Sequence, residues 1–95
     1  MKYYLYILET VDNTLYTGIT PDIKKRFEQH LNKKGAKYTI SHKPKEIVYL
    51  NIFENKSQAS SEEYRIKKKL LRKEKLELIE NNKKQTKELL KMAGF

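Results

Sequence analysis

Two apolar, tyrosine-bearing segments lie near the start of the chain on either side of a polar break. The segments are Lys2–Thr10 and Thr14–Thr20, and both are rich in β-branched and aromatic residues. Asp12 and Asn13 lie between them, and both residue types tolerate the positive φ of a tight hairpin. The pattern therefore predicts two antiparallel strands joined by a short turn.

A helical period follows Thr20. Thr20 can cap a helix that has Pro21 at its first position and Asp22 in its first turn, where a carboxylate stabilises the helix dipole. We expect this helix to continue to about Lys33 and to end before Gly35, which tolerates a left-handed stop.

The rest of the chain predicts one more strand and three more helices. Residues 35–45, GAKYTISHKPK, have no helical period, so we expect a basic loop. The later elements are a strand over Glu46–Glu54, a helix from a cap at Ser57 to about Leu71, and short helices over Lys73–Glu80 and Gln85–Ala93, with Gly94 as the stop. The order β-β-α-β-α-α-α predicts an α+β fold, a three-stranded antiparallel sheet with helices packed around it.

Length and composition exclude several kinds of protein. The chain has 95 residues, so we expect one small domain over residues 1–95. It has no cysteine, which excludes disulfides, thiolate metal sites and a cysteine nucleophile. Its first apolar run is far shorter than the roughly 20 residues that span a bilayer, so we expect a cytoplasmic protein with no membrane partner.

The chain is strongly basic. Its 21 lysines and arginines exceed its 12 acidic residues, for a formal net charge of +9. Such a charge attracts polyanions in a salt-dependent way and predicts nucleic acid as the partner. A basic, solvated surface without this function would have the same composition.

Two polar side chains of the first helix border its apolar stripe. Ile23, Phe27 and Leu31 recur every fourth residue and form the predicted core positions. Arg26 and His30 lie one turn apart on one shoulder of this stripe. The alternatives are a half-buried His30 bonded to a carbonyl and an Arg26 that reaches solvent.

Glu63 has a similar position on the longer second helix. It lies at the edge of the narrow apolar stripe of Ala59, Ile66 and Leu70, whereas Glu62 could be the exposed acid. An inward carboxylate is costly unless a cation, hydrogen bonds or a metal meets it. The alternative is an ion pair with a lysine at the rim of the helix.

Together with Tyr6 and Tyr16, these polar residues fit phosphodiester cleavage. A carboxylate can hold a divalent cation, an arginine can stabilise the phosphate charge, and a phenol or imidazole can move protons. The sequence contains no glycine-rich phosphate loop, no His-Glu-x-x-His motif and no nucleophile elbow.

The segment YLYILETVDNTLYTGITPDIKKRFEQH resembles the GIY-YIG nuclease domain family, in its small stand-alone bacterial form. Tyr4–Tyr6 stand where that family has Gly-Ile-Tyr, and Tyr16–Gly18 stand where it has Tyr-Ile-Gly. The resemblance continues through Arg26 and His30 to Glu63 and covers essentially the whole chain. Each short motif is degenerate, but the ordered set of five positions is specific.

This resemblance implies metal-dependent hydrolysis of DNA phosphodiester bonds, with Mg²⁺ or Mn²⁺ as the cofactor. Glu63 would be the single protein ligand of the cation, and Arg26 would stabilise the phosphate. Tyr6 and Tyr16 would border the active site, with Tyr16 contacting the attacking water or helping to deprotonate it. His30 would assist proton transfer or occupy the place of a third tyrosine.

Some positions depart from the family pattern. Tyr4–Leu5 replace the first glycine and isoleucine, which changes packing more than chemistry, and Ile19 stands where some repair-enzyme relatives carry a lysine. Gly18, expected at a strand end, would let the backbone approach the substrate. The late asparagine of the family has two candidates, Asn81 and Asn82, and neither is assigned.

The shared active-site role predicts Tyr6 and Tyr16 on one face of the sheet. A two-residue turn at Asp12 and Asn13 would place them on opposite faces. A three-residue loop or a bulge that pairs Thr10 with Tyr16 would bring both to one face, and we expect this arrangement.

Two other functions remain open from the sequence. A non-catalytic module of the same fold would bind DNA, or RNA, with lysines of the basic loop and the second long helix. These lysines are Lys37, Lys43 and Lys45 in the loop and Lys67, Lys68 and Lys69 on the helix. A protein-interaction subunit of a DNA repair complex would instead use the last helix, with Leu89, Leu90 and Phe95. The five polar positions favour the nuclease.

Overall fold

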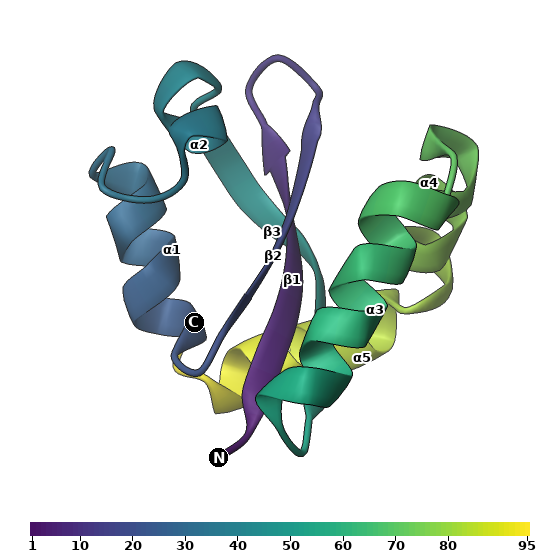
Figure 1. Cartoon of the computed structure of the whole chain (residues 1–95). Helices are drawn as coiled ribbons and strands as arrows, with labels where there is room; N and C mark the ends of the chain where they lie inside the picture. The colour runs from purple at the N-terminus through teal and green to yellow at the C-terminus, as the bar shows by residue number, and fades with distance from the viewer.

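Three antiparallel strands and five helices form the structure, a computed structural model that describes residues 1–95 (Figure 1). The strands are β1 (Tyr3–Thr10), β2 (Leu15–Thr20) and β3 (Pro44–Phe53). The helices are α1 (Ile23–Leu31), α2 (Lys37–Ser41), α3 (Lys56–Lys69), α4 (Arg72–Asn81) and α5 (Lys83–Met92). The predicted α+β class and the order of the elements are confirmed, and α2 is an additional short helix.

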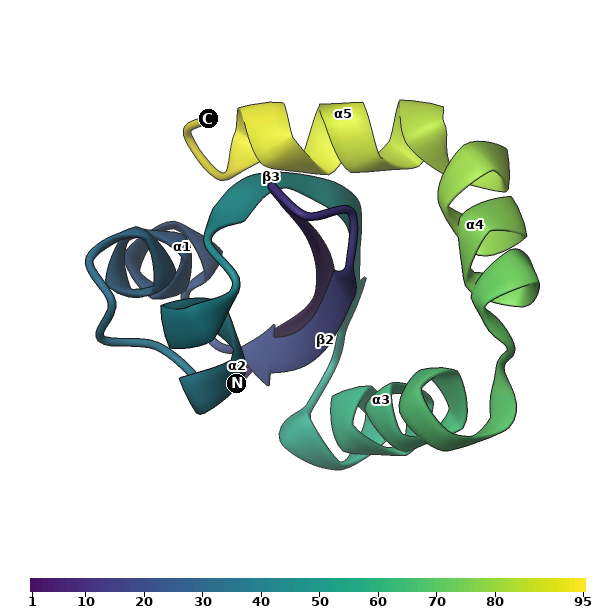
Figure 2. The ribbon, with the colours of Figure 1, turned by 90° about the horizontal axis from the view of Figure 1, so that it is seen from above.

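The central strand β1 is buried on both faces. The sheet has the order β2-β1-β3. Leu5 and Ile7 pack towards α3 and α4, whereas Tyr6 and Leu8 pack towards α1 and α5. Figure 2 shows these helices arranged around the curved sheet. A strand covered on both sides needs apolar residues at successive positions, which explains the unbroken apolar run in β1.

Helix α1 begins two residues later than predicted. Its N-cap is Asp22, whose side chain accepts a hydrogen bond from the backbone N–H of Lys25. The hydroxyl of Thr20 instead accepts the backbone N–H of Asp22 at 3.1 Å and forms a local turn. Pro21 therefore lies in this turn, before the helix.

The end of α1 also differs from the prediction. The helix stops at Leu31, and Lys33 rather than Gly35 has a positive φ, of 58°. Leu31 is 46% exposed, so its predicted core position is wrong. His30 is the residue that turns inward in the last helical turn.

Residues 35–45 do not form an irregular loop. They contain α2 and the start of β3 at Pro44. A helix of five residues is too short to show a periodic apolar stripe, and only Thr39 is buried in it. The cap of α3 was also wrongly predicted: Asn55, not Ser57, accepts the backbone N–H of Gln58.

Helix α5 packs against the sheet of its own chain. Leu89 and Leu90 contact one core cluster, and the Phe95 ring lies 5.8 Å from the ring of Phe27. Gly94 has a φ of 95°, as expected for a helix stop. The apolar residues suggested for a protein partner thus contact the domain itself. None of the helices has the length and apolar character needed to cross a bilayer.

Candidate active site

The side chains of Tyr6 and Tyr16 lie on the same face of the sheet. The Thr10 N–H donates to the Thr14 carbonyl at 3.0 Å, so residues 11–13 form a three-residue loop, and Tyr16 is opposite Leu8. The two phenol ring centroids are 6.4 Å apart. The prediction of one shared face is confirmed. The predicted pairing of Thr10 with Tyr16 is wrong, and the observed register differs from it by two residues, which leaves every side chain on the same face.

Gly18 makes room for the Tyr6 phenol. It lies within β2, directly opposite Tyr6, and not at the end of the strand as expected. A Cβ atom on Gly18 would lie 2.5 Å from the Tyr6 hydroxyl oxygen. The space that we expected to admit substrate is therefore filled by the phenol, and any larger residue would displace it.

His30 joins Tyr6 to helix α2 through two hydrogen bonds. The Tyr6 hydroxyl lies 2.9 Å from Nε2, and the Thr39 hydroxyl lies 2.6 Å from Nδ1. The Thr39 hydroxyl donates its single proton to the Ala36 carbonyl at 2.9 Å, so it accepts from His30 Nδ1–H. Nε2 is then the unprotonated nitrogen of the neutral ring, and the Tyr6 hydroxyl donates to it.

His30 is completely enclosed. It has no exposed surface, and a Cβ atom on Gly35 would lie 2.3 Å from its Nδ1. The tight contact with Gly35 closes the chain over the imidazole ring. The half-buried histidine bonded to a carbonyl is therefore not what the structure contains, since both ring nitrogens face hydroxyl groups.

Burial and charge keep Tyr6 and His30 neutral at pH 7. Burial, together with a smaller effect of the positive charge of Arg26, lowers the pKa of His30 to about 4. Burial raises the pKa of Tyr6 to about 12, against the opposing effect of the nearby Arg26 guanidinium. Arg26 itself is half-buried, and its Nη1 donates to Gln29 Oε1 at 3.1 Å.

Glu63 approaches this group from α3. Its charge is close enough to raise the pKa of Tyr6. Its Oε2 lies 3.2 Å from Lys67 Nζ, and that nitrogen lies 5.5 Å from the centroid of the Tyr16 ring. The ion pair with a lysine is observed, but the side chain of Glu63 is part-exposed to about the same extent as that of Glu62, so the predicted contrast between the two carboxylates is not observed.

The structure thus brings together Tyr6, Tyr16, Arg26, His30 and Glu63, and we refer to them as the five-residue cluster. The cluster offers a single carboxylate, that of Glu63, as a metal ligand. The chain has no group of three or more His, Cys, Asp or Glu side chains that could hold a metal. Mg²⁺ commonly uses one or two carboxylates together with waters and substrate phosphates. Glu63 fits that kind of site, provided that its bond to Lys67 is released.

The other predicted binding residues are dispersed. Lys45 Nζ lies 4.0 Å from Glu9 Oε1 on the strands, and Lys37 and Lys68 are exposed on different helices. Lys43 comes just before β3. Of these lysines, only Lys67 contacts the five-residue cluster, and a role for the others stays a prediction.

Helix α2 supplies residues that the sequence reasoning missed. Tyr38 stacks on Tyr16 with ring centroids 5.8 Å apart and on His42 with centroids 4.3 Å apart. His42 Nδ1 lies 2.6 Å from Asp12 Oδ2 in the hairpin loop. No periodic signal could have found these contacts or that of Thr39, because they depend on how α2 is placed over the sheet.

The model of the GIY-YIG catalytic domain matches residues 2–77, which include the whole five-residue cluster. The chain belongs to the GIY-YIG family. This is a nuclease-type family, so the resemblance seen in the sequence is confirmed at the level of the family. Asn81 and Asn82 lie beyond the part of the chain that matches the GIY-YIG domain.

Similar chains occur in several bacteria. A UPF0213 protein of Streptococcus pyogenes serotype M3 is 45% identical over 86 residues, 90% of this chain and 94% of that protein. One of Oceanobacillus iheyensis is 51% identical over 79 residues, 83% and 91% of the two chains. The solution NMR structure of a UPF0213 protein from Bacillus halodurans has a TM-score of 0.58 and 38% identity, with 87% of each chain covered.

Proposed function

We propose that this GIY-YIG domain hydrolyses phosphodiester bonds in DNA with the help of Mg²⁺ or Mn²⁺. The observation that carries the proposal is the bond from the Tyr6 hydroxyl to His30 Nε2 beside the charges of Arg26 and Glu63. It joins a proton donor, a proton acceptor, a cation and a carboxylate in one place, which is what attack of water on a phosphodiester requires.

Tyr6 and His30 move the proton of the attacking water. The Tyr6 oxygen accepts a proton from water while its own proton passes to His30 Nε2, so the phenol stays neutral. In the free protein this transfer is unfavourable, because the pKa of His30 is about 4. An anionic phosphate near the ring favours the imidazolium and assists it. Tyr16, next to Tyr6, contacts and orients the water.

Arg26 and Glu63 handle the charge of the substrate. The guanidinium of Arg26 binds the non-bridging oxygens of the scissile phosphate. Glu63 would hold the divalent cation after the substrate phosphate attracts Lys67 away from it. When bound, such a cation neutralises phosphate charge and lowers the pKa of a coordinated water.

Glu63→Gln and its neighbour Glu62→Gln form a matched test. Glu62 lies on the same helix and has a similarly part-exposed side chain. Its Oε2 lies 2.7 Å from Arg65 Nη2, and this ion pair is not part of the five-residue cluster. We expect Glu63→Gln to abolish Mg²⁺- or Mn²⁺-dependent cutting of labelled DNA, and Glu62→Gln to retain it. Equal activity of the two variants, or no cutting of any DNA by the intact protein, would contradict the proposal.

A non-catalytic nucleic-acid-binding module is the second candidate. The ion pair between Glu63 and Lys67 favours it, because a carboxylate already paired is a weaker cation ligand. This candidate predicts salt-dependent DNA binding in EDTA, together with no cutting after addition of either cation.

A further inference from the structure

Four residues of α3 form a single row that includes Glu63. Lys56, Ser60, Glu63 and Lys67 are spaced by four, three and four positions, so they lie one above another on one face of the helix. Lys56 and Ser60 precede Glu63 by about two turns and one turn. The row therefore leads from the start of α3 to the five-residue cluster.

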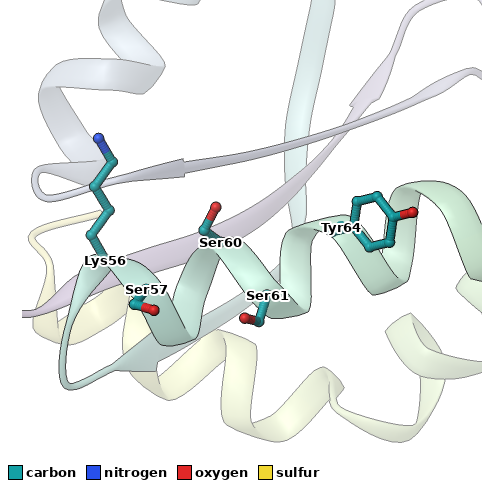
Figure 3. Close-up of a pocket in the computed structure, with 5 residues that line it drawn as sticks. All are labelled: Lys56, Ser57, Ser60, Ser61 and Tyr64. Carbon is teal, nitrogen blue, oxygen red and sulfur yellow. The ribbon is translucent and has the colours of Figure 1, made fainter.

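A shallow hollow of about 720 Å³ lies beside the first half of this row. Its lining residues are Lys56, Ser57, Ser60, Ser61 and Tyr64, and we call this surface the α3 groove (Figure 3). In Figure 3, Lys56 and Ser60 point towards the upper edge of the helix, and Ser57 and Ser61 lie lower on it. All five residues are exposed.

The chemistry of the α3 groove suits a phosphate backbone. It presents four hydroxyl groups and one ammonium group and no carboxylate. Lys56 forms no ion pair, unlike Lys67 in the same row. Serine, tyrosine and lysine side chains are common partners of phosphate oxygens, and these contacts carry no base specificity.

The length of the row also fits a nucleic-acid strand. Seven residues separate Lys56 from Glu63, which corresponds to about 10 Å along the helix axis. This distance is long enough for contacts with more than one phosphate of a strand. Tyr64, whose residue is 59% exposed, adds a ring on which an unstacked base can lie.

We propose that the α3 groove binds the sugar-phosphate backbone of the substrate strand on one side of the bond to be cut. This inference rests on the proposed function, because the α3 groove would position the substrate strand next to Glu63. The binding itself does not depend on cutting and can be measured without it.

The test compares Lys56→Glu with Lys87→Glu. Both variants change the net charge by the same amount. Lys87 is an exposed lysine of α5, the helix that packs on β3 at the other side of the sheet, so it lies away from the α3 groove (Figure 2). A carboxylate at the start of α3 is favourable to the helix, so the first variant should fold. The probe is a short fluorescein-labelled oligothymidylate in EDTA, with anisotropy measured over a range of salt concentrations.

We expect Lys56→Glu to weaken binding roughly tenfold more than Lys87→Glu. The slope of log affinity against log salt should also fall by about 0.7 for each phosphate that the variant no longer neutralises. The backbone amides of Ser57, Ser60 and Tyr64 should shift in NMR spectra when the oligonucleotide is added to the intact protein. Ser60→Ala and Tyr64→Ala should each weaken binding with the net charge unchanged.

Equal effects of the two lysine variants, or amide shifts confined to residues outside α3, would overturn the inference. The proposed function can fail separately. If the α3 groove binds the probe but no DNA is cut with Mg²⁺ or Mn²⁺, the hydrolysis proposal is wrong and the binding surface stands. If DNA is cut and the groove variants behave like the control, only the groove proposal is wrong.

Discussion

The Tyr6 hydroxyl lies 2.9 Å from Nε2 of His30, inside the protein, and the opposite ring nitrogen is bonded to the Thr39 hydroxyl. Strand β1, helix α1 and helix α2 each supply one member of this chain. Because Thr39 accepts from Nδ1–H, it leaves Nε2 as the acceptor that Tyr6 requires. This relationship makes Thr39 a positioning residue for the proposed proton transfer.

Thr39→Val should release the His30 ring from its observed tautomer. The valine leaves the buried Nδ1–H without a partner, which costs about 1–3 kcal/mol in the free energy of unfolding. Thr39→Ser keeps the hydroxyl and should retain the tautomer. The measurement is the pair of ¹⁵N chemical shifts of the His30 ring, with urea unfolding in parallel. An unchanged Nδ1–H signal in Thr39→Val would contradict the assignment.

Gly18→Ala should destabilise the fold through a direct clash with Tyr6. The added Cβ would lie 2.5 Å from the phenol oxygen, and overpacking of this kind costs about 1–3 kcal/mol. In a Tyr6→Leu background, where the phenol is absent, the same glycine change should cost much less. A double-mutant cycle by urea unfolding measures the difference. Equal costs in both backgrounds would show that the clash is absent.

The stability should fall as the pH falls from about 6.5 to about 4. The pKa of His30 is lowered to about 4 in the folded protein from its usual 6.5, so the unfolded chain binds more protons in this window. The full shift corresponds to about 3 kcal/mol, lost progressively on acidification.

Removing the imidazole should abolish that pH dependence. His30→Asn is expected to be less stable at pH 7 but nearly insensitive to pH between 7 and 5. Asp12 does not obscure this range, because its pKa is lowered to about 2 by its bonds to Thr10 and His42, and its contribution is lost only below pH 4. A wild-type urea midpoint that stays constant from pH 7 to 4.5 would rule out the buried neutral histidine.

Lys67→Met should lower the cation concentration needed for cutting. Lys67 Nζ lies 3.2 Å from Glu63 Oε2, and methionine keeps the apolar stem while it removes the competing charge. We expect half-maximal cutting at a several-fold lower Mn²⁺ concentration, measured at saturating DNA. The control is Lys69→Met, which replaces an exposed lysine at the end of the same helix. A raised cation requirement would mean that Lys67 does not compete for Glu63.

Local patterns predicted every strand and helix except α2, but not their exact ends. The β-branched run of β1 and the apolar spacing on α3 predicted a strand and a helix that the structure contains. Asp22 and Asn55 replaced Thr20 and Ser57 as helix caps, because several neighbouring residues can cap a helix and the packing selects among them. Leu31 was placed in the core by its spacing, although α1 ends there.

The residues of the candidate site were also only partly predictable from the sequence. Tyr6, Tyr16, Arg26, His30 and Glu63 were found in the sequence because their order and spacing match a known family. Thr39 and Tyr38 were not, because α2 is a single short helix whose contacts depend on distant parts of the chain. The sequence predicts that Gly18 admits substrate, whereas the pairing of β2 with β1 places Gly18 against the Tyr6 phenol.

The sequence by itself determined the α+β class, the order of strands and helices, the basic charge and the five polar positions, since these follow from local periodicity, composition and spacing. Glu63 and Lys67 pair locally, four residues apart on α3. The tertiary structure decided the register that brings both phenols to one face and the tautomer of His30. Those features depend on loop length, strand pairing and contacts between residues far apart in the chain, and no local pattern encodes them.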